Sequence, residues 1–148
     1  MKENSEPTSE PTDVAAIAAV TRVWEQALAN HDAEALLACY APDATLESPV
    51  AAHLLGGRGV CRGHDELRQL FTAVVARTPD ERHYHRGSFF TDGHRVMWEY
   101  PRHTPTGDQM DFVEVMEIED GLICAHRIYW GWRGIQILAN DQYYRPPN

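Results

Sequence analysis

Residues 109–132 read QMDFVEVMEIEDGLICAHRIYWGW, and they decide the fold because they encode two long strands joined by a tight turn. Apolar and polar residues alternate on both sides of Asp120-Gly121, a dipeptide typical of hairpin turns. One face of the first strand carries Phe112, Glu114, Met116 and Ile118, and one face of the second carries Leu122, Cys124, His126, Ile128 and Trp130. Glu114 and His126 are therefore the polar members of two otherwise apolar rows.

The length of the turn decides which residue Glu114 faces, and the sequence allows two lengths. A three-residue turn, Glu119-Asp120-Gly121, puts Glu114 directly opposite His126. A two-residue turn, Asp120-Gly121, flips the pairing and puts Glu114 opposite Arg127 as a structural ion pair. The first arrangement places a carboxylate beside an imidazole among apolar neighbours, which is what acid–base chemistry requires.

The rest of the chain predicts further strands and three helices. Strands are expected at 44–48, 82–90 and 95–103, and the last two are joined at Asp92-Gly93. The helices carry apolar stripes at Val14, Ile17, Thr21, Trp24 and Leu28, at Leu36, Leu37 and Tyr40, and at Leu67, Leu70, Phe71, Val74 and Val75. Asp13 and Asp32 can cap the first two helices, and Pro42-Asp43 is expected to end the second.

The first of these strands ends at Pro49, which has no N–H to donate to a sheet, and a glycine-rich loop is expected after it. The order of elements is helix, helix, strand, helix and then an antiparallel meander. This order predicts an α+β fold in which one curved antiparallel sheet buries a face against three N-terminal helices.

The composition is that of an acidic globular domain. The 148 residues are 43% hydrophobic and 24% charged, with a formal net charge of −9, and this length suits one domain with a buried core. No Lys/Arg run occurs, so nucleic acids and anionic membranes are not expected partners. We expect a disordered leader at 1–12, a single domain at 13–135 and a C-terminal tail at 136–148.

The cysteines and the apolar segments indicate a cytoplasmic protein. The three cysteines lie far apart and form no CxxC pair, which favours reduced thiols over a disulfide framework. No signal peptide is recognisable, and no apolar run approaches the length that spans a membrane.

Three segments together resemble the nuclear transport factor 2-like superfamily, in particular its SnoaL-like and ketosteroid-isomerase-like members. They are WEQALANHDAEALLACYAPDATLESPV (24–50), RGHDELRQLF (62–71) and DFVEVMEIEDGLICAHRIYWGW (111–132), and the similarity covers residues 14–133. The resemblance implies a cone, in which a bent sheet wraps round the helices and leaves a pocket open at one end. The superfamily holds isomerases, dehydratases, cyclases, epoxide hydrolases and non-enzymatic binding modules.

The resemblance also implies roles for single residues. Glu114 matches an acidic oxyanion-hole residue of the ketosteroid-isomerase group, which favours the register that faces His126. His126 and Trp130 match pocket-lining positions, and Ser48 lies at a corner of the pocket. Two departures stand against steroid isomerisation by the family mechanism: Trp24 replaces a tyrosine, and Ser48 replaces the aspartate that acts as base. A serine does not shuttle protons at neutral pH without help.

His83 is a third candidate catalytic residue. It shares a strand face with His85, and a two-residue turn at Asp92-Gly93 would set the two histidines opposite Arg102 and Tyr100. The resemblance extends to the scytalone-dehydratase branch, which carries a catalytic histidine on the corresponding strand. The alternative is a histidine at the surface or stacked at the sheet edge. A metal site is not expected, because no third ligand stands at usable spacing.

Together these features predict a pocket for a small, mostly apolar ligand that carries a carbonyl or hydroxyl group. The expected catalytic residues are Glu114 and His126, assisted by His83, and the expected substrate-binding residues are Trp24, Ser48, Trp98, Tyr100, Phe112, Ile128 and Trp130. The first hypothesis is a cofactor-free enzyme that isomerises, dehydrates or cyclises its substrate. The alternative is a non-catalytic ligand-binding or association module of the same fold.

The outward face of the last two strands predicts a homodimer. Val113 and Val115 lie beside Ala125 and Tyr129 on that face, and no predicted helix remains to cover them. A sheet face this apolar is usually buried, and the family resemblance also implies dimers through it.

Overall fold

A six-stranded sheet in the order β2-β1-β6-β5-β4-β3 forms the body of the protein. The computed structural model describes residues 14–78, 89–104 and 106–143. Its helices are α1 (Val14–Ala29), α2 (Ala33–Leu37), α3 (Pro49–Leu55), α4 (Gly63–Arg77) and α5 (Trp132–Ala139). Its strands are β1 (Tyr40–Glu47), β2 (Val60–Arg62), β3 (Phe90–Thr91), β4 (Arg95–His103), β5 (Gln109–Glu119) and β6 (Leu122–Trp130).

The α+β class predicted from the sequence is confirmed, with one difference in the sheet. β1 runs parallel to β6, whereas all other neighbouring strands are antiparallel. The sheet is therefore mixed, and not purely antiparallel as expected. A parallel pair requires a long crossover connection, which the chain between β1 and β6 supplies.

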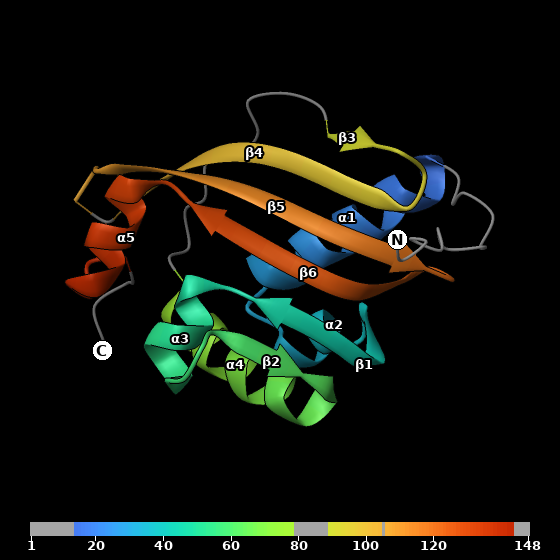
Figure 1. Ribbon diagram of the computed structural model, residues 1–148, viewed down its shortest axis with the longest axis horizontal. Helices are drawn as coiled ribbons and strands as arrows, with labels where there is room; N and C mark the ends of the chain where they lie inside the picture. Colours follow the sequence, from blue (N-terminus) through green and yellow to red (C-terminus); the bar gives the residue numbers. More distant parts are fainter. Residues whose placement is uncertain (1–13, 79–88, 105, 144–148) are drawn as a thin grey trace, which may run out of the picture.

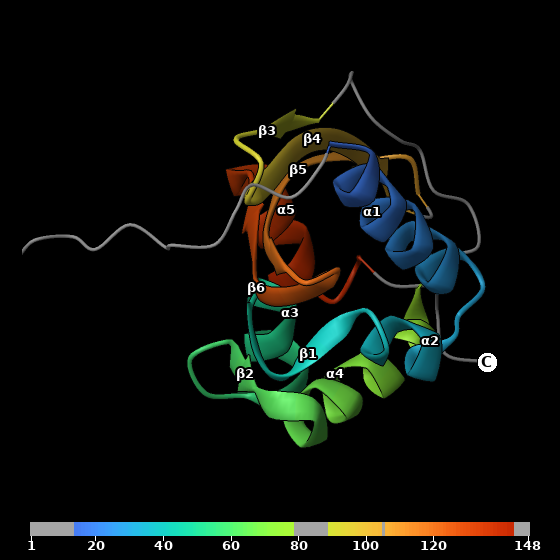
Figure 2. The ribbon, with the colours of Figure 1, turned by 90° about the vertical axis from the view of Figure 1, so that its right-hand side faces the viewer.

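The sheet is bent, and its concave side is packed against helices. Figure 1 shows the long strands β4, β5 and β6 side by side, and Figure 2 shows the sheet turning from β3 and β4 through β6 to β1 and β2. The core joins the helices to the sheet through Ile17, Leu36, Leu67 and Leu70 on one side and Leu46, Val96, Met116 and Ile123 on the other. None of the described helices is long and apolar enough to cross a membrane.

The first two helices form where the apolar stripes predict them. Asp32 caps α2, because its Oδ1 accepts a hydrogen bond from the Ala35 N–H at 2.9 Å. Val14 is the exception to the first stripe, since it begins α1 and is exposed. Tyr40 was expected at the end of the second helix, but it begins β1. Pro42 is tolerated inside β1 because the pairing with β6 is interrupted between Tyr40 and Thr45.

The segment after β1 is more ordered than the predicted glycine-rich loop. Residues 49–62 include helix α3 and strand β2. The Ser48 Oγ accepts a hydrogen bond from the Val50 N–H at 3.1 Å, and Pro49 occupies the first turn of α3. Ser-Pro therefore ends a strand and begins a helix, because proline at the first helical position needs no N–H partner.

The β5–β6 hairpin follows neither of the two predicted registers over its whole length. The turn has two residues, since Glu119 pairs with Leu122. A bulge then shifts the register, so that Glu117 pairs with Ala125 and Glu114 pairs with Ile128. The extra residue of a bulge occupies one strand only. As a result, Glu114 and His126 lie diagonally on one face of the sheet, and Arg127 pairs with Val115.

Two further expectations change at the ends of the sheet. Phe90 pairs with Met97, so the turn at Asp92-Gly93 is longer than the predicted two residues, and Asp92 closes it by accepting hydrogen bonds from the backbone N–H groups of His94 and Arg95. Residues 136–143 were assigned to a tail, but α5 runs to Ala139 and buries Ile137 and Leu138. The sequence did not indicate α5 because a helix of 8 residues gives too short a periodic pattern.

Candidate functional site

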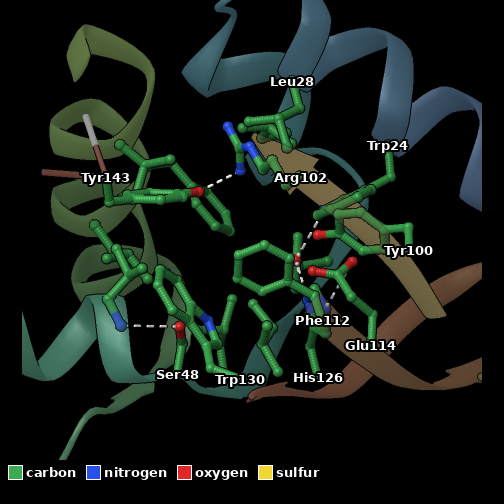
Figure 3. A pocket seen from close by; sticks show the side chains of 18 residues that line it. Trp24, Leu28, Ser48, Tyr100, Arg102, Phe112, Glu114, His126, Trp130 and Tyr143 are labelled. Atoms are coloured by element: carbon green, nitrogen blue, oxygen red, sulfur yellow. Dashed lines mark hydrogen bonds and ion pairs between the residues drawn. The ribbon is translucent and has the colours of Figure 1, made fainter. Parts of the chain in front are cut away.

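An aromatic cavity lies between the concave face of the sheet and the helices (Figure 3). Its lining is Trp24, Leu28, Leu36, Tyr40, Leu46, Ser48, Val50, Leu70, Phe71, Val74, Tyr100, Arg102, Phe112, Glu114, His126, Ile128, Trp130 and Tyr143. The space between these side chains measures ≈ 620 Å³ with the mouth included. Its walls are mainly aromatic and aliphatic, which suits a small, largely apolar ligand.

Three buried side chains form a hydrogen-bonded chain at one end of this cavity. Trp24 Nε1 donates to the Tyr40 hydroxyl at 3.0 Å, and the Tyr40 hydroxyl lies 2.7 Å from Nδ1 of His126. The Trp24 ring also meets the His126 ring edge to face, with 5.5 Å between centroids. α1, β1 and β6 each supply one member, so the chain exists only in the folded protein.

This chain fixes the tautomer of His126. The Tyr40 oxygen already accepts the Trp24 N–H, and the described residues offer its own proton no acceptor other than His126 Nδ1. Burial and, secondly, the negative charge of Glu114 raise the pKa of Tyr40 well above its ordinary value, so the hydroxyl keeps its proton. Tyr40 therefore donates to Nδ1, and the neutral imidazole carries its proton on Nε2.

The Nε2 atom of His126 faces the carboxylate of Glu114. Nε2 and Oε2 of Glu114 are 3.7 Å apart, and both side chains are almost completely buried. This separation exceeds a hydrogen bond, and neither atom has a hydrogen-bond partner among the described residues. A buried donor and a buried acceptor thus stand side by side on the wall of the cavity (Figure 3). Buried polar groups without partners are uncommon and mark places where a ligand or water can bind.

The opposite end of the cavity carries a buried cation. Arg102 lies on β4, is 4% exposed, and donates from Nη1 to the Tyr143 hydroxyl. Its guanidinium carbon also lies 4.8 Å from the centroid of the Tyr143 ring. Tyr143 follows α5 and meets Trp130, with 4.8 Å between their ring centroids. The chain after α5 therefore closes this end of the cavity.

Six of the seven expected substrate-binding residues line the cavity: Trp24 at the end described above, and five others that form the walls between the two ends. These five are Ser48, Tyr100, Phe112, Ile128 and Trp130. Phe112 is central, because it stacks on Tyr100 with 5.3 Å between ring centroids and meets Trp130 edge to face at 4.6 Å. Trp98 is buried but does not line the cavity, since it packs behind Trp24 with 6.0 Å between centroids.

The remaining expected residue, His83, lies outside the described residues, as does His85. Among the described residues, no group of three or more His, Cys, Asp or Glu side chains is placed to hold a metal ion. The three cysteines form no disulfide.

Sequence reasoning missed Tyr40, Arg102 and Tyr143 as members of the site. Arg102 had a visible signal, because it continues the inward row Val96, Trp98 and Tyr100 as its only charged member. Tyr40 had been assigned to a helix and Tyr143 to a tail, so neither could be placed against the sheet.

The family of the chain follows from comparison with known proteins. The SnoaL-like domain family matches residues 20–126, and the chain belongs to this family. No curated protein sequence matches the chain significantly.

Solved structures of similar fold span nearly the whole domain. An NTF2-like protein of unknown function from Burkholderia pseudomallei K96243 is 22% identical, with a TM-score of 0.68, and the match covers 83% of this chain and 96% of that chain. A steroid delta-isomerase from Pseudomonas aeruginosa is 21% identical, with a TM-score of 0.63, and covers 90% and 93% of the two chains. TerC, co-crystallised with polyporic acid, is 19% identical, with a TM-score of 0.68 and coverage of 84% and 98%. At these identities the likeness establishes the NTF2-like fold alone.

Proposed function

We propose that this protein is an enzyme that transfers protons on a small, largely apolar substrate bearing a carbonyl or hydroxyl group. The reaction class is isomerisation, dehydration or cyclisation, performed by the protein's own side chains. The observation that carries the proposal is the pair Glu114 Oε2 and His126 Nε2, 3.7 Å apart on the cavity wall and without a hydrogen-bond partner in the described part of the chain. A substrate oxygen would accept a hydrogen bond from His126 Nε2, and the C–H group next to that oxygen would face Glu114 Oε2.

In the proposed reaction each residue has a separate role. His126 presents Nε2–H, so it donates a hydrogen bond to the substrate oxygen and stabilises the negative charge that forms there. Glu114, as a carboxylate, takes the proton from the carbon next to the carbonyl; the C–H electron pair becomes the double bond of an enolate. Glu114 then returns the proton to the same carbon or to a conjugated one. Tyr40 positions His126 by holding its Nδ1.

The similarity to a protein named steroid delta-isomerase supports isomerisation as a reaction that this fold accommodates. Ser48 stands where the family mechanism has its aspartate base, and a serine cannot take the proton. We therefore assign the role of base to Glu114. Glu114 lies two positions along the sheet from Phe112, within the aromatic walls where a flat ring would bind.

The second candidate function is a ligand-binding module without catalysis. The aromatic side chains of the cavity favour it, because Trp24 and Trp130 both line the space that a larger substrate would need. In this reading Glu114 and His126 hold a ligand through hydrogen bonds and no bond to carbon breaks.

Hydrogen–deuterium exchange of flat ketones distinguishes the two functions. The probes are 2-tetralone and 2-acetylnaphthalene in D₂O; NMR follows loss of the protons next to the carbonyl, and tryptophan fluorescence measures binding. We expect the protein to accelerate exchange of a bound ketone, and Glu114→Gln to reduce the acceleration roughly 100-fold or more. Glu117→Gln is the matched control, because Glu117 is on the same strand but pairs with Arg127 outside the cavity.

Binding without accelerated exchange would contradict the enzyme and support the module. Equal exchange by Glu114→Gln and the unaltered protein would contradict the assignment of Glu114 as the base. The amide is nearly isosteric, so circular dichroism should show an unchanged fold in both variants.

A further inference from the structure

Arg102 is the one buried arginine of the described residues, and its guanidinium is only partly used. Nη1 donates to the Tyr143 hydroxyl, but Nε and Nη2 have no hydrogen-bond partner among residues 14–78, 89–104 and 106–143. Figure 3 shows the guanidinium on the cavity side of β4, above Phe112 and beside Tyr143. Arg102 therefore lines the cavity as a cation whose Nε and Nη2 are available to a ligand.

The unused pair is the edge with which arginine binds a carboxylate. In this same protein Arg68 donates from Nε and Nη2 to the two carboxylate oxygens of Glu34. Arg95 uses the same two nitrogens on Asp92. Nε and Nη2 point the same way and match the spacing of two oxygens. In Arg102 no described side chain occupies this fork.

No described carboxylate neutralises Arg102. It pairs across the sheet with Met110, whereas Glu114 pairs with Trp98. Met110 and Glu114 are four positions apart along β5, a distance of about 13 Å. Removing a guanidinium from water is costly without a counter-charge, and arginine does not lose its proton. The fold therefore maintains a desolvated cation at a position where an anion from outside the chain can bind.

We propose that Arg102 is an anion-binding subsite that receives the carboxylate or ionised enol of the ligand. The inference rests on the proposed function for the other end of the ligand, where Glu114 and His126 act. It names the substrate class: a flat, conjugated acid with its anionic group at Arg102 and its reactive carbonyl or hydroxyl about 13 Å away along the strands. Phe112 and Tyr100 lie between the two ends and stack on the ring system.

Tyr143 is the positioning residue of this subsite. Its hydroxyl accepts the Nη1 hydrogen bond and its ring lies against the guanidinium, which leaves the Nε–Nη2 edge turned to the cavity. Tyr143→Phe should therefore weaken anion binding less than loss of the guanidinium itself, because the ring contact remains.

The test compares 2-naphthoate with 2-naphthamide, which have nearly the same shape but differ in charge. Titration calorimetry on the full chain should show that the protein binds the carboxylate at least about tenfold more tightly, since charge-assisted pairs are about twice as strong as neutral ones. Arg102→Met should remove this preference and leave the affinity for the amide within about threefold. Arg102→Lys should keep part of it, because lysine carries the charge without the fork.

Equal affinity of the unaltered protein for both probes, binding of neither probe, or a preference that survives in Arg102→Met would each overturn the subsite. If Arg102→Met does not fold, Arg102→Lys decides, and an undiminished preference in that variant overturns it. Glu114→Gln separates this proposal from the enzymatic one. It should retain the preference for 2-naphthoate, so a subsite that stands while ketone exchange fails would refute only the proposed chemistry.

Discussion

The hydroxyl of Tyr40 lies 2.7 Å from Nδ1 of His126, although the two residues are 86 positions apart in the sequence. With the Trp24 N–H as a second partner, this hydroxyl orients the imidazole towards Glu114. Tyr40, at the start of β1, thus sets the orientation of His126 on β6, which we propose takes part in the reaction.

Tyr40→Phe tests this control. The substitution leaves the Trp24 N–H and His126 Nδ1 buried without their partner, so the free energy of unfolding should fall by about 1–3 kcal/mol. Nitrogen NMR of His126 should change from the tautomer with the proton on Nε2 to a mixture. Tyr129→Phe is the control, because Tyr129 is exposed on the outer face of β6. Unchanged ¹⁵N shifts of His126 in Tyr40→Phe would show that the hydroxyl does not set the tautomer.

Ser48 should act on stability through α3. Ser48→Ala removes the side-chain cap of the helix and should lower the free energy of unfolding by about 1 kcal/mol, whereas Ser48→Thr keeps a hydroxyl and should cost less. Urea denaturation measures both. If 2-naphthoate affinity also falls more than about threefold in Ser48→Ala, the hydroxyl contacts the ligand as well. Equal stability of Ser48→Ala and the unaltered protein would contradict the capping role.

Asp141 should make stability depend on pH at the end of the chain. Hydrogen bonds from His53 and Arg77 lower the pKa of Asp141. Because the pKa is lower in the folded than in the unfolded state, the contribution is complete above the unfolded value of about 3.9 and is lost as the pH falls through the folded value. Asp141→Asn should therefore reduce the free energy of unfolding at pH 6 by less than about 1 kcal/mol, since the pair is exposed, and the reduction should shrink as the pH falls below about 3.9.

Asparagine suits this test because Asp141 has a φ of 58°, a left-handed conformation that asparagine adopts readily. Asp43→Asn removes an equal charge from an exposed position of β1 and serves as control. A difference between Asp141→Asn and the unaltered protein that does not shrink as the pH falls below about 3.9 would show that the effect does not come from ionisation.

The outer face of the sheet should form a homodimer. Tyr129 is 55% exposed there and Met97 is 44% exposed, beside the partly buried Val113 and Val115. Sedimentation velocity at about 100 μM should give a dimer, because an apolar face of this kind is usually covered. Tyr129→Lys should shift it towards monomer, whereas Val23→Lys on α1 replaces an equally exposed apolar residue elsewhere and should not. A monomer for the unaltered chain would refute the proposal.

Local sequence was sufficient for most of the elements and for the inward faces of β4 and β5. It was wrong at the start of β6, because the bulge puts Ile123, and not Leu122 or Cys124, on the core face with His126. The stripe that includes Ile17 and Trp24 predicted α1, Asp32 marked the start of α2, and alternation placed Glu114 and Phe112 on the cavity face. These features depend on periodicity and capping, which act within a few residues.

The tertiary structure decided which of these side chains meet. The bulge in the β5–β6 hairpin set Glu114 diagonal to His126, and neither predicted turn length includes such a bulge. The parallel pairing of β1 with β6 brought Tyr40 to His126, and the packing of the chain after α5 brought Tyr143 to Arg102. Contacts of this kind join residues far apart in the chain, so they depend on how the sheet bends and on what covers it, which no short-range pattern in the sequence contains.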